Sequence, residues 1–170
     1  MKIMESKNKK TALICGSFDP ITLGHLDIVR RAASLFDTVY LTAFINPEKK
    51  YCFTKEQRLR FMTGACADIP NVICGFDSGM VCDYVINNNI DCIVKGIRNE
   101  NDLAYETKMA DFNRERSGRE TLLLVSSSEL SDCSSTLVRE TLKKGGDLTA
   151  LLPESILSEV KTAFKDNNDN

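Results

Sequence analysis

Residues 16–25 combine side chains of the types that bind phosphate groups. They read Gly-Ser-Phe-Asp-Pro-Ile-Thr-Leu-Gly-His and follow directly on an apolar run that ends at Cys15. Gly16 allows the backbone to approach a ligand closely, and Ser17 adds a hydroxyl. His25 stands where the next helix is expected to begin, and the N-terminus of a helix favours an anion. The sequence therefore predicts a phosphate-binding turn between a strand and a helix.

His25 is the only histidine of the chain, so any role that needs an imidazole must fall on it. A single histidine at an arbitrary position is more often a partly buried side chain that donates one hydrogen bond. Here the strand, the turn and the helix around it favour a role facing a phosphate. The patterns Gly-x-x-x-x-Gly-Lys-Ser/Thr and Gly-x-Gly-x-x-Gly are both absent, so a different way of binding a nucleotide is expected.

Basic and hydroxyl side chains follow two further predicted strands. Lys95 and Arg98 come after an apolar run that ends at Val94, and two cations at a strand end indicate polyphosphate binding. The serine-rich residues 126–136 join a strand to an amphipathic helix, where hydroxyls and free N–H groups can bind β- and γ-phosphates. Asp132 in this run would repel a triphosphate unless it points away or meets Mg²⁺. These positions form a second group of candidate phosphate ligands.

The pattern Gly-Ser-Phe-Asp-Pro-Ile-Thr-x-Gly-His-x-Asp resembles the signature of nucleotidyltransferases that carry a His-x-Gly-His or Thr-x-Gly-His motif. Four later blocks extend the resemblance over residues 11–153; they are 46–54, 94–98, 102–113 and 134–140. Together they make the chain similar to the phosphopantetheine adenylyltransferases. The resemblance implies transfer of the adenylyl group of ATP to 4′-phosphopantetheine, with dephospho-coenzyme A and pyrophosphate as products, in coenzyme A biosynthesis.

The resemblance also implies a site with an ATP side and an acceptor side. For ATP it implies Ser17, Phe18, His25, Gly96, Ile97, Arg98, Glu106, Leu130, Ser131, Asp132, Cys133, Ser134, Ser135 and Thr136. For 4′-phosphopantetheine it implies Ser17, Lys49, Met80, Val81, Lys95 and Asn113. Catalytic roles would fall on Lys49, on Arg98 and on His25, the last as the group that stabilises the transition state. Mg²⁺ with ATP and a homo-oligomer, commonly a hexamer, are implied in the same way.

The expected reaction is one in-line displacement at the α-phosphorus of ATP. A phosphate nucleophile is anionic near neutral pH and needs no general base, and no nucleophile is paired with a base that would form a covalent intermediate. Two alternatives stay open. One is transfer of an adenylyl or cytidylyl group to another small phosphate, such as a mononucleotide or glycerol phosphate. The other is a nucleotide-binding regulatory domain without turnover.

Short apolar runs alternate with helical patterns along the chain. We expect about five buried parallel strands, over residues 11–15, 39–45, 72–74, 92–94 and 121–125. Between them, residues 28–36 and 59–66 carry apolar side chains on one helical face. This alternation predicts a single doubly wound, Rossmann-like α/β domain with helices on both faces of the sheet. We expect the domain to span 11–164, with a flexible extension over 1–10 and a disordered tail over 165–170.

The composition narrows the class of protein. The chain has 170 residues, of which 42% are hydrophobic and 27% charged, and this suits one soluble globular domain. A formal net charge of -2 argues against nucleic-acid binding through a broad basic surface. No apolar stretch reaches membrane-spanning length, and the polar start of the chain does not look like a signal peptide. The 7 scattered cysteines include no Cys-x-x-Cys pair, which favours a reducing, cytoplasmic compartment.

Overall fold

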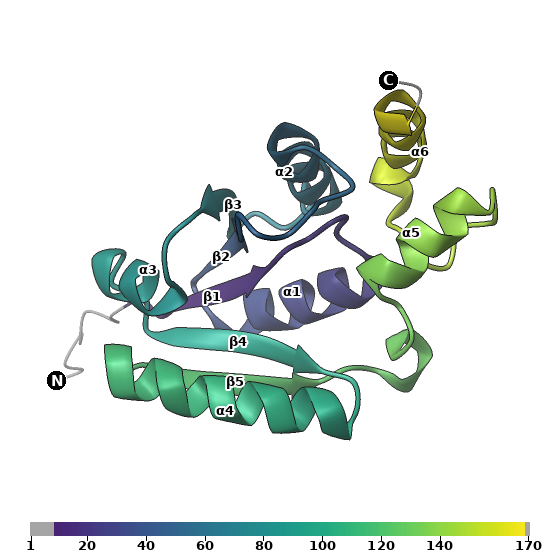
Figure 1. The fold of residues 1–170 in the computed structure, drawn as a ribbon. Coiled ribbons are helices and arrows are strands. Elements are labelled where there is room, and N and C mark those ends of the chain that lie inside the picture. The colour runs from purple at the N-terminus through teal and green to yellow at the C-terminus, as the bar shows by residue number, and fades with distance from the viewer. Residues whose placement is uncertain (1–8, 169–170) are drawn as a thin grey trace, which may run out of the picture.

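The computed structural model describes residues 9–168. Residues 1–8, which make up most of the predicted N-terminal extension, and residues 169–170 of the predicted tail lie outside this range. Five parallel strands form one sheet in the order β3-β2-β1-β4-β5 (Figure 1). The strands are β1 (Thr11–Gly16), β2 (Thr38–Phe44), β3 (Val72–Asp77), β4 (Cys92–Ile97) and β5 (Glu120–Val125). The helices are α1 (Leu23–Leu35), α2 (Lys55–Ala65), α3 (Val81–Asn87), α4 (Glu100–Ser117), α5 (Ser135–Lys143) and α6 (Glu154–Asn168), with a short 3₁₀ helix at Ser128–Leu130.

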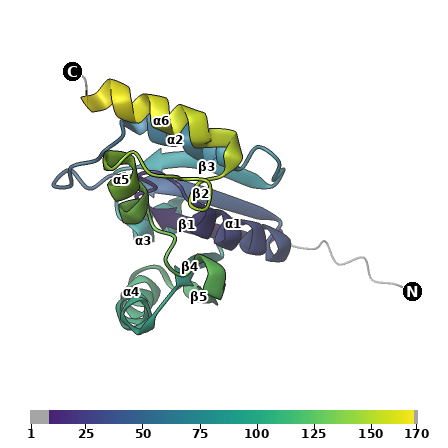
Figure 2. The ribbon, with the colours of Figure 1, turned by 90° about the vertical axis from the view of Figure 1, so that its right-hand side faces the viewer.

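The sheet separates two hydrophobic layers. Successive side chains of a strand point to opposite faces. In β1, Ala12 and Ile14 therefore belong to one buried cluster, while Leu13 and Cys15 belong to the other. Helices α1, α2 and α6 lie on the first side and α3 and α4 on the second, as Figure 2 shows. The predicted doubly wound α/β fold with helices on both faces is confirmed.

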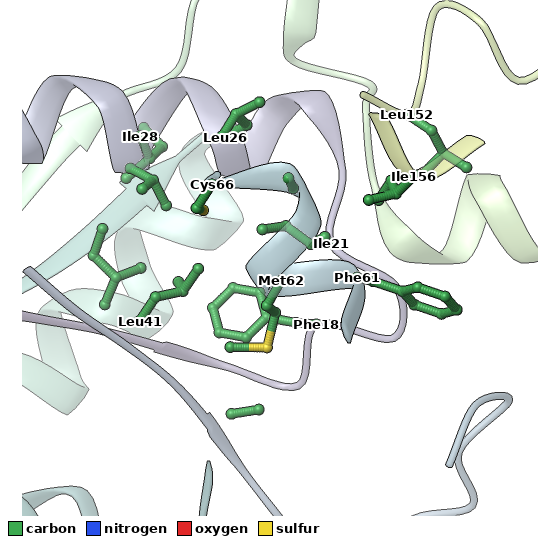
Figure 3. Close-up of a cluster of buried hydrophobic side chains, with 14 of the residues drawn as sticks. Phe18, Ile21, Leu26, Ile28, Leu41, Phe61, Met62, Cys66, Leu152 and Ile156 are labelled. Carbon is green, nitrogen blue, oxygen red and sulfur yellow. The ribbon is translucent and has the colours of Figure 1, made fainter. Parts of the chain in front are cut away.

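The turn after β1 is anchored in the larger of these clusters. Figure 3 shows Phe18 and Ile21, from this turn, in one cluster with Phe61 and Met62 of α2. Each of the four side chains is at most 2% exposed. Burying a large apolar side chain stabilises a fold by about 1.5–3 kcal/mol. The segment that carries the predicted phosphate site is thus held by the core on one side.

The strand order reverses between β1 and β4. β1 pairs with β2 on one side and with β4 on the other, so the chain leaves β1 and β4 in opposite directions along the sheet. In open parallel sheets, ligands bind beyond the carboxyl ends of the strands at such a point. The loops concerned follow Gly16 and Ile97. Both belong to the segments for which the sequence predicts phosphate ligands.

Two strands extend well beyond the apolar runs that predicted them. β3 ends at Asp77 and β4 at Ile97, three residues beyond each predicted end. Residues 95–97 of β4 pair in parallel with residues 123–125 of β5. Strand β5 therefore supplies the pairing partners for residues 95–97, whose composition, Lys-Gly-Ile, is not typical of a buried strand.

The C-terminal helix is also longer than predicted. α6 continues to Asn168, so residues 165–168 are helical and the prediction of disorder for them is wrong. The side-chain amide of Asn167 donates to the Cys52 carbonyl at 3.0 Å and to Gln57 Oε1 at 2.9 Å. These bonds fasten the end of the helix to the start of α2, and local sequence could not reveal them. No helix within residues 9–168 combines the length and the apolarity needed to cross a bilayer.

Candidate active site

A cavity of about 380 Å³ lies beyond the carboxyl ends of β1 and β4. Its walls come from the turn after β1, the start of α1, the end of β4 and the loop that leads from β5 into α5. The predicted site residues that line it are Ser17, Phe18, His25, Lys49, Lys95, Gly96, Arg98, Leu130, Cys133, Ser134, Ser135 and Thr136. Segments far apart in the sequence thus meet in one hollow.

The turn after β1 has a backbone conformation that few side chains adopt. Phe18 has a φ of 46°, in the left-handed region that is rare for a bulky residue. Its buried ring meets the ring of His25 edge to face, with the centroids 5.2 Å apart. Strain of this kind persists where the surrounding structure over-determines the conformation. Burial of Phe18 therefore fixes the turn and one side of the imidazole together.

The first turn of α1 sets the position of His25. Thr22 is the N-cap, and its hydroxyl accepts the backbone N–H of His25 at 3.4 Å. In return, the backbone N–H of Thr22 donates to Nδ1 of His25 at 3.1 Å. Burial first, and then the charges of Arg98 and Lys95, lower the pKa of His25 to about 4. His25 is therefore uncharged at neutral pH, and because Nδ1 accepts a bond, the ring proton is on Nε2.

Lys49 reaches from the loop after β2 to the turn after β1. Its Nζ donates to the hydroxyl oxygen of Ser17 at 2.9 Å. The loop is fastened to the same turn by Asp19, whose carboxylate accepts the backbone N–H groups of Cys52 at 2.9 Å and Phe53 at 3.0 Å. The sequence pattern alone could not separate Lys49 from a solvated surface lysine. The fold brings it to the cavity wall beside a predicted ligand.

The two cations at the end of β4 are paired with carboxylates of α4. Nζ of Lys95 lies 3.5 Å from Glu106 and donates to the carbonyl of Cys15 at 3.3 Å. The guanidinium of Arg98 donates twice to Asp102, at 2.7 and 3.1 Å. Burial lowers the pKa of Lys95, but Cys15 and Glu106 outweigh it and raise the pKa overall, while Asp102 raises the pKa of Arg98. Both side chains therefore stay cationic at neutral pH.

The serine-rich loop closes the cavity next to the start of α1. Ser134 is the N-cap of α5, and its hydroxyl accepts a backbone N–H of the first turn. The Ser135 hydroxyl donates to the Pro20 carbonyl at 2.8 Å and so links the two loops. Gly24 permits the close approach, because a Cβ at this position would lie 2.9 Å from the carbonyl oxygen of Cys133. The N-termini of α1 and α5 thus lie against the same hollow.

Arg139 lines the cavity but is missing from the sequence prediction. Its guanidinium donates to the Asp19 carbonyl at 2.7 Å and to the Thr136 hydroxyl at 3.1 Å. A signal was present in the sequence. Arg139 follows Thr136 by three positions, and residues three apart share a face of a helix. Arg139 therefore adds a further cation to the phosphate-binding candidates.

Some predicted site residues do not line the cavity. They are Met80, Val81, Ile97, Glu106, Asn113, Ser131 and Asp132. Glu106 is joined to the cavity wall through its ion pair with Lys95, and Asp132 adds to the effect of Asp102 in raising the pKa of Arg98. Asn113 is buried within α4, and Met80 is the N-cap of α3. The roles of all these residues stay predictions.

The described residues provide no metal cage of their own. Within residues 9–168, no group of three or more His, Cys, Asp or Glu side chains is placed to hold an ion. Mg²⁺ in nucleotide sites is commonly held by phosphates and water with one or two carboxylates. Mg²⁺ with ATP therefore stays a prediction.

The chain was also compared with known proteins. Residues 13–141 match the cytidylyltransferase-like family. The chain is similar to the phosphopantetheine adenylyltransferase of Nocardioides sp. (strain ATCC BAA-499 / JS614). The two are 43% identical over 148 residues, which cover 86% of this chain and 92% of that protein. The resemblance found from the sequence motifs is confirmed, and the family match contains every residue that lines the cavity.

Proposed function

The chain belongs to the cytidylyltransferase-like family and is a nucleotidyltransferase, and we propose that it transfers the adenylyl group of ATP to 4′-phosphopantetheine. The products are dephospho-coenzyme A and pyrophosphate. The observation that carries the proposal is the place of His25, an uncharged donor at a helix start, in a cavity that Lys49, Lys95, Arg98 and Arg139 also line. The name of the Nocardioides relative supports the choice of acceptor.

In the proposed reaction, an oxygen of the acceptor phosphate forms a bond to the α-phosphorus of ATP. The bond from that phosphorus to the pyrophosphate oxygen breaks, and pyrophosphate leaves with the electron pair. Since the acceptor phosphate is anionic near neutral pH, the protein has to align the groups and stabilise charge rather than remove a proton. The Nε2–H of His25 donates to an oxygen of the α-phosphate. Its pKa of about 4 means that the imidazole is neutral near pH 7 before the substrates bind.

We assign the acceptor phosphate to Lys49 and Ser17. These two side chains lie 2.9 Å apart at the cavity wall and offer an ammonium and a hydroxyl to one phosphate. Lys95 supplies a second cation from β4. The pantetheine arm then extends toward α3 and α4, where Met80, Val81 and Asn113 are the candidate contacts.

We assign the triphosphate to the start of α5. Ser134, Ser135 and Thr136 line the cavity there together with Arg98 and Arg139. Free N–H groups and the dipole of the helix favour β- and γ-phosphates at this end. Leu130 and Cys133 line the wall beside them, and Phe18, Gly96, Ile97, Ser131 and Asp132 complete the proposed ATP side.

Glu106 is assigned to the ribose. Its Oε2 atom is buried and has no hydrogen-bond partner within residues 9–168. A carboxylate oxygen can accept a bond from a ribose hydroxyl. The other side of the carboxylate stays with Lys95, at 3.5 Å from Nζ.

Further parts of the proposal rest on the resemblance alone. Mg²⁺ bound to ATP would neutralise part of the phosphate charge, and the protein would work in the cytoplasm as a homohexamer. Size-exclusion chromatography with light scattering tests the assembly, and a smaller particle at working concentration would contradict it. Omission of Mg²⁺ with EDTA present tests the ion, because unchanged turnover would remove it from the reaction.

Mass spectrometry of the products tests the reaction itself. The protein is incubated with Mg-ATP and 4′-phosphopantetheine, and dephospho-coenzyme A is the expected product. Parallel incubations contain a mononucleotide or glycerol phosphate, with CTP replacing ATP in a further set. Faster pyrophosphate release with one of those acceptors would overturn the proposed substrate. ATP binding without pyrophosphate release from any acceptor would indicate a regulatory domain instead.

A further inference from the structure

Arg58 of α2 is a buried cation that the proposed reaction does not use. Its side chain is among the largest that are buried, with 2% of the residue exposed. None of the salt bridges formed within residues 9–168 includes Arg58. Its Nε atom is buried and makes no hydrogen bond in that range. Burying a cation in this way is costly, so the contacts that it does make have to compensate.

Those contacts include one with each of the two segments that form the proposed acceptor site. Nη1 of Arg58 donates to the backbone carbonyl of Ser17 at 2.8 Å. The centre of the guanidinium lies 3.9 Å from the ring centroid of Tyr51 and 5.1 Å from that of Phe76. Stacking of a guanidinium on aromatic rings is favourable, and more so when both are desolvated. Arg58 therefore joins the turn after β1 to the loop after β2.

Tyr51 connects this cation to Lys49. The Tyr51 hydroxyl accepts the backbone N–H of Asn46 at 2.8 Å, which closes residues 46–51 into a compact loop. Nζ of Lys49 lies 5.7 Å from the centroid of the same ring and 2.9 Å from the Ser17 hydroxyl. The ring near Lys49 and the backbone of Ser17 are thus both in contact with one guanidinium.

We propose that Arg58 is a positioning residue for the acceptor phosphate. From behind the cavity wall, Arg58 holds Ser17 and the loop of residues 46–51 in fixed positions relative to each other. Arg58 does not itself line the cavity. Its effect passes through the Ser17 carbonyl and the Tyr51 ring, and its fixed charge adds to the positive potential at the Ser17–Lys49 pair. The inference rests on the proposed function, since it concerns the acceptor side of that reaction.

Three variants of the full chain test the proposal by steady-state kinetics. Arg58→Lys keeps the charge but loses the planar stacking group, and Tyr51→Leu removes the ring while Arg58 stays. Arg60→Gln is the matched control, because Arg60 lies on the same helix and pairs at the surface with Glu159. We expect the KM for 4′-phosphopantetheine to rise by about tenfold in the first two variants. The KM for ATP should change by less than about twofold, the size of a typical surface substitution.

The outcomes separate positioning from general damage. Thermal unfolding and ATP titration establish that each variant is folded, and if Arg58→Lys does not fold, Tyr51→Leu decides alone. A parallel rise of both KM values would give Arg58 a merely structural role and overturn the proposal. The proposal would also be overturned if the KM for 4′-phosphopantetheine in Arg58→Lys and Tyr51→Leu equalled that of Arg60→Gln. If the unsubstituted chain and Arg60→Gln both bind ATP but release no pyrophosphate with 4′-phosphopantetheine, the proposed function fails first, and the inference falls with it.

Discussion

The backbone N–H of Thr22 donates to Nδ1 of His25 at 3.1 Å, so the N-cap of α1 also selects the tautomer of the imidazole. The Thr22 hydroxyl lies 2.9 Å from the same nitrogen. Protonation of Nδ1 would break the bond from the backbone N–H, and burial opposes the charge that would result. The spacing of a hydroxyl and an imidazole three residues apart thus serves the helix and the chemistry at once.

The first prediction concerns the titration of His25. Burial and two cations lower its pKa to about 4, against 6.5 in an unfolded chain. Between these values the unfolded state binds the proton and the folded state does not, so the free energy of unfolding rises with pH from about 4 to 6.5. NMR of the only histidine should show a neutral ring down to about pH 5. A midpoint near 6.5 in the folded protein would contradict the partly buried, capped ring.

The second prediction concerns the rate. His25→Ala should lower kcat roughly 100- to 1,000-fold, the cost of losing one donor to a developing charge. The affinity for ATP, measured by titration calorimetry, should change far less, since the interaction strengthens only in the transition state. His25→Gln, whose amide can still donate, should keep more of the rate. Unchanged turnover in His25→Ala would show that the imidazole does not stabilise the transition state.

Local sequence was enough to predict the sheet and the start of the site. The apolar run up to Cys15, the Gly-Ser turn and the helix start near His25 each depend on neighbours a few residues away, and all fold as the local pattern indicates. The capping box of Thr54 and Gln57 at α2 is likewise formed by residues only three positions apart. Such features need no knowledge of the rest of the chain.

Contacts between distant segments were not predictable. Arg58 stands in a helix whose sequence gives no reason to bury a cation, and the Ser17 carbonyl that accepts its hydrogen bond belongs to another segment. The ion pair of Lys95 with Glu106 likewise joins β4 to α4. The helical state of Asn167 depends on its bonds to the start of α2. In each case, tertiary partners decide what the local pattern leaves open.

The third prediction concerns the acceptor side. Lys49→Met should raise the KM for 4′-phosphopantetheine by about 10- to 100-fold, because it removes a charge-assisted bond to a phosphate. Lys50→Met, one position along the same loop, should behave like the unsubstituted chain. Initial rates at varied acceptor and saturating Mg-ATP measure both. Equal effects of the two substitutions would show that Lys49 acts only through the general charge of the loop.

The last prediction concerns the contact between the two helix starts. A Cβ at Gly24 would lie 2.9 Å from the backbone carbonyl of Cys133, and a backbone atom cannot move aside as a flexible side chain does. Gly24→Ala should therefore lower the free energy of unfolding by about 1–3 kcal/mol, as overpacking does, and weaken ATP binding because the loop before α5 shifts. Gly75→Ala is the control, since a Cβ there meets no atom within 4 Å. Urea unfolding and ATP titration of both variants measure the difference. If Gly24→Ala matched Gly75→Ala in stability and in ATP affinity, the loop before α5 would move aside at no cost. Its close approach to α1 would then not shape the triphosphate site.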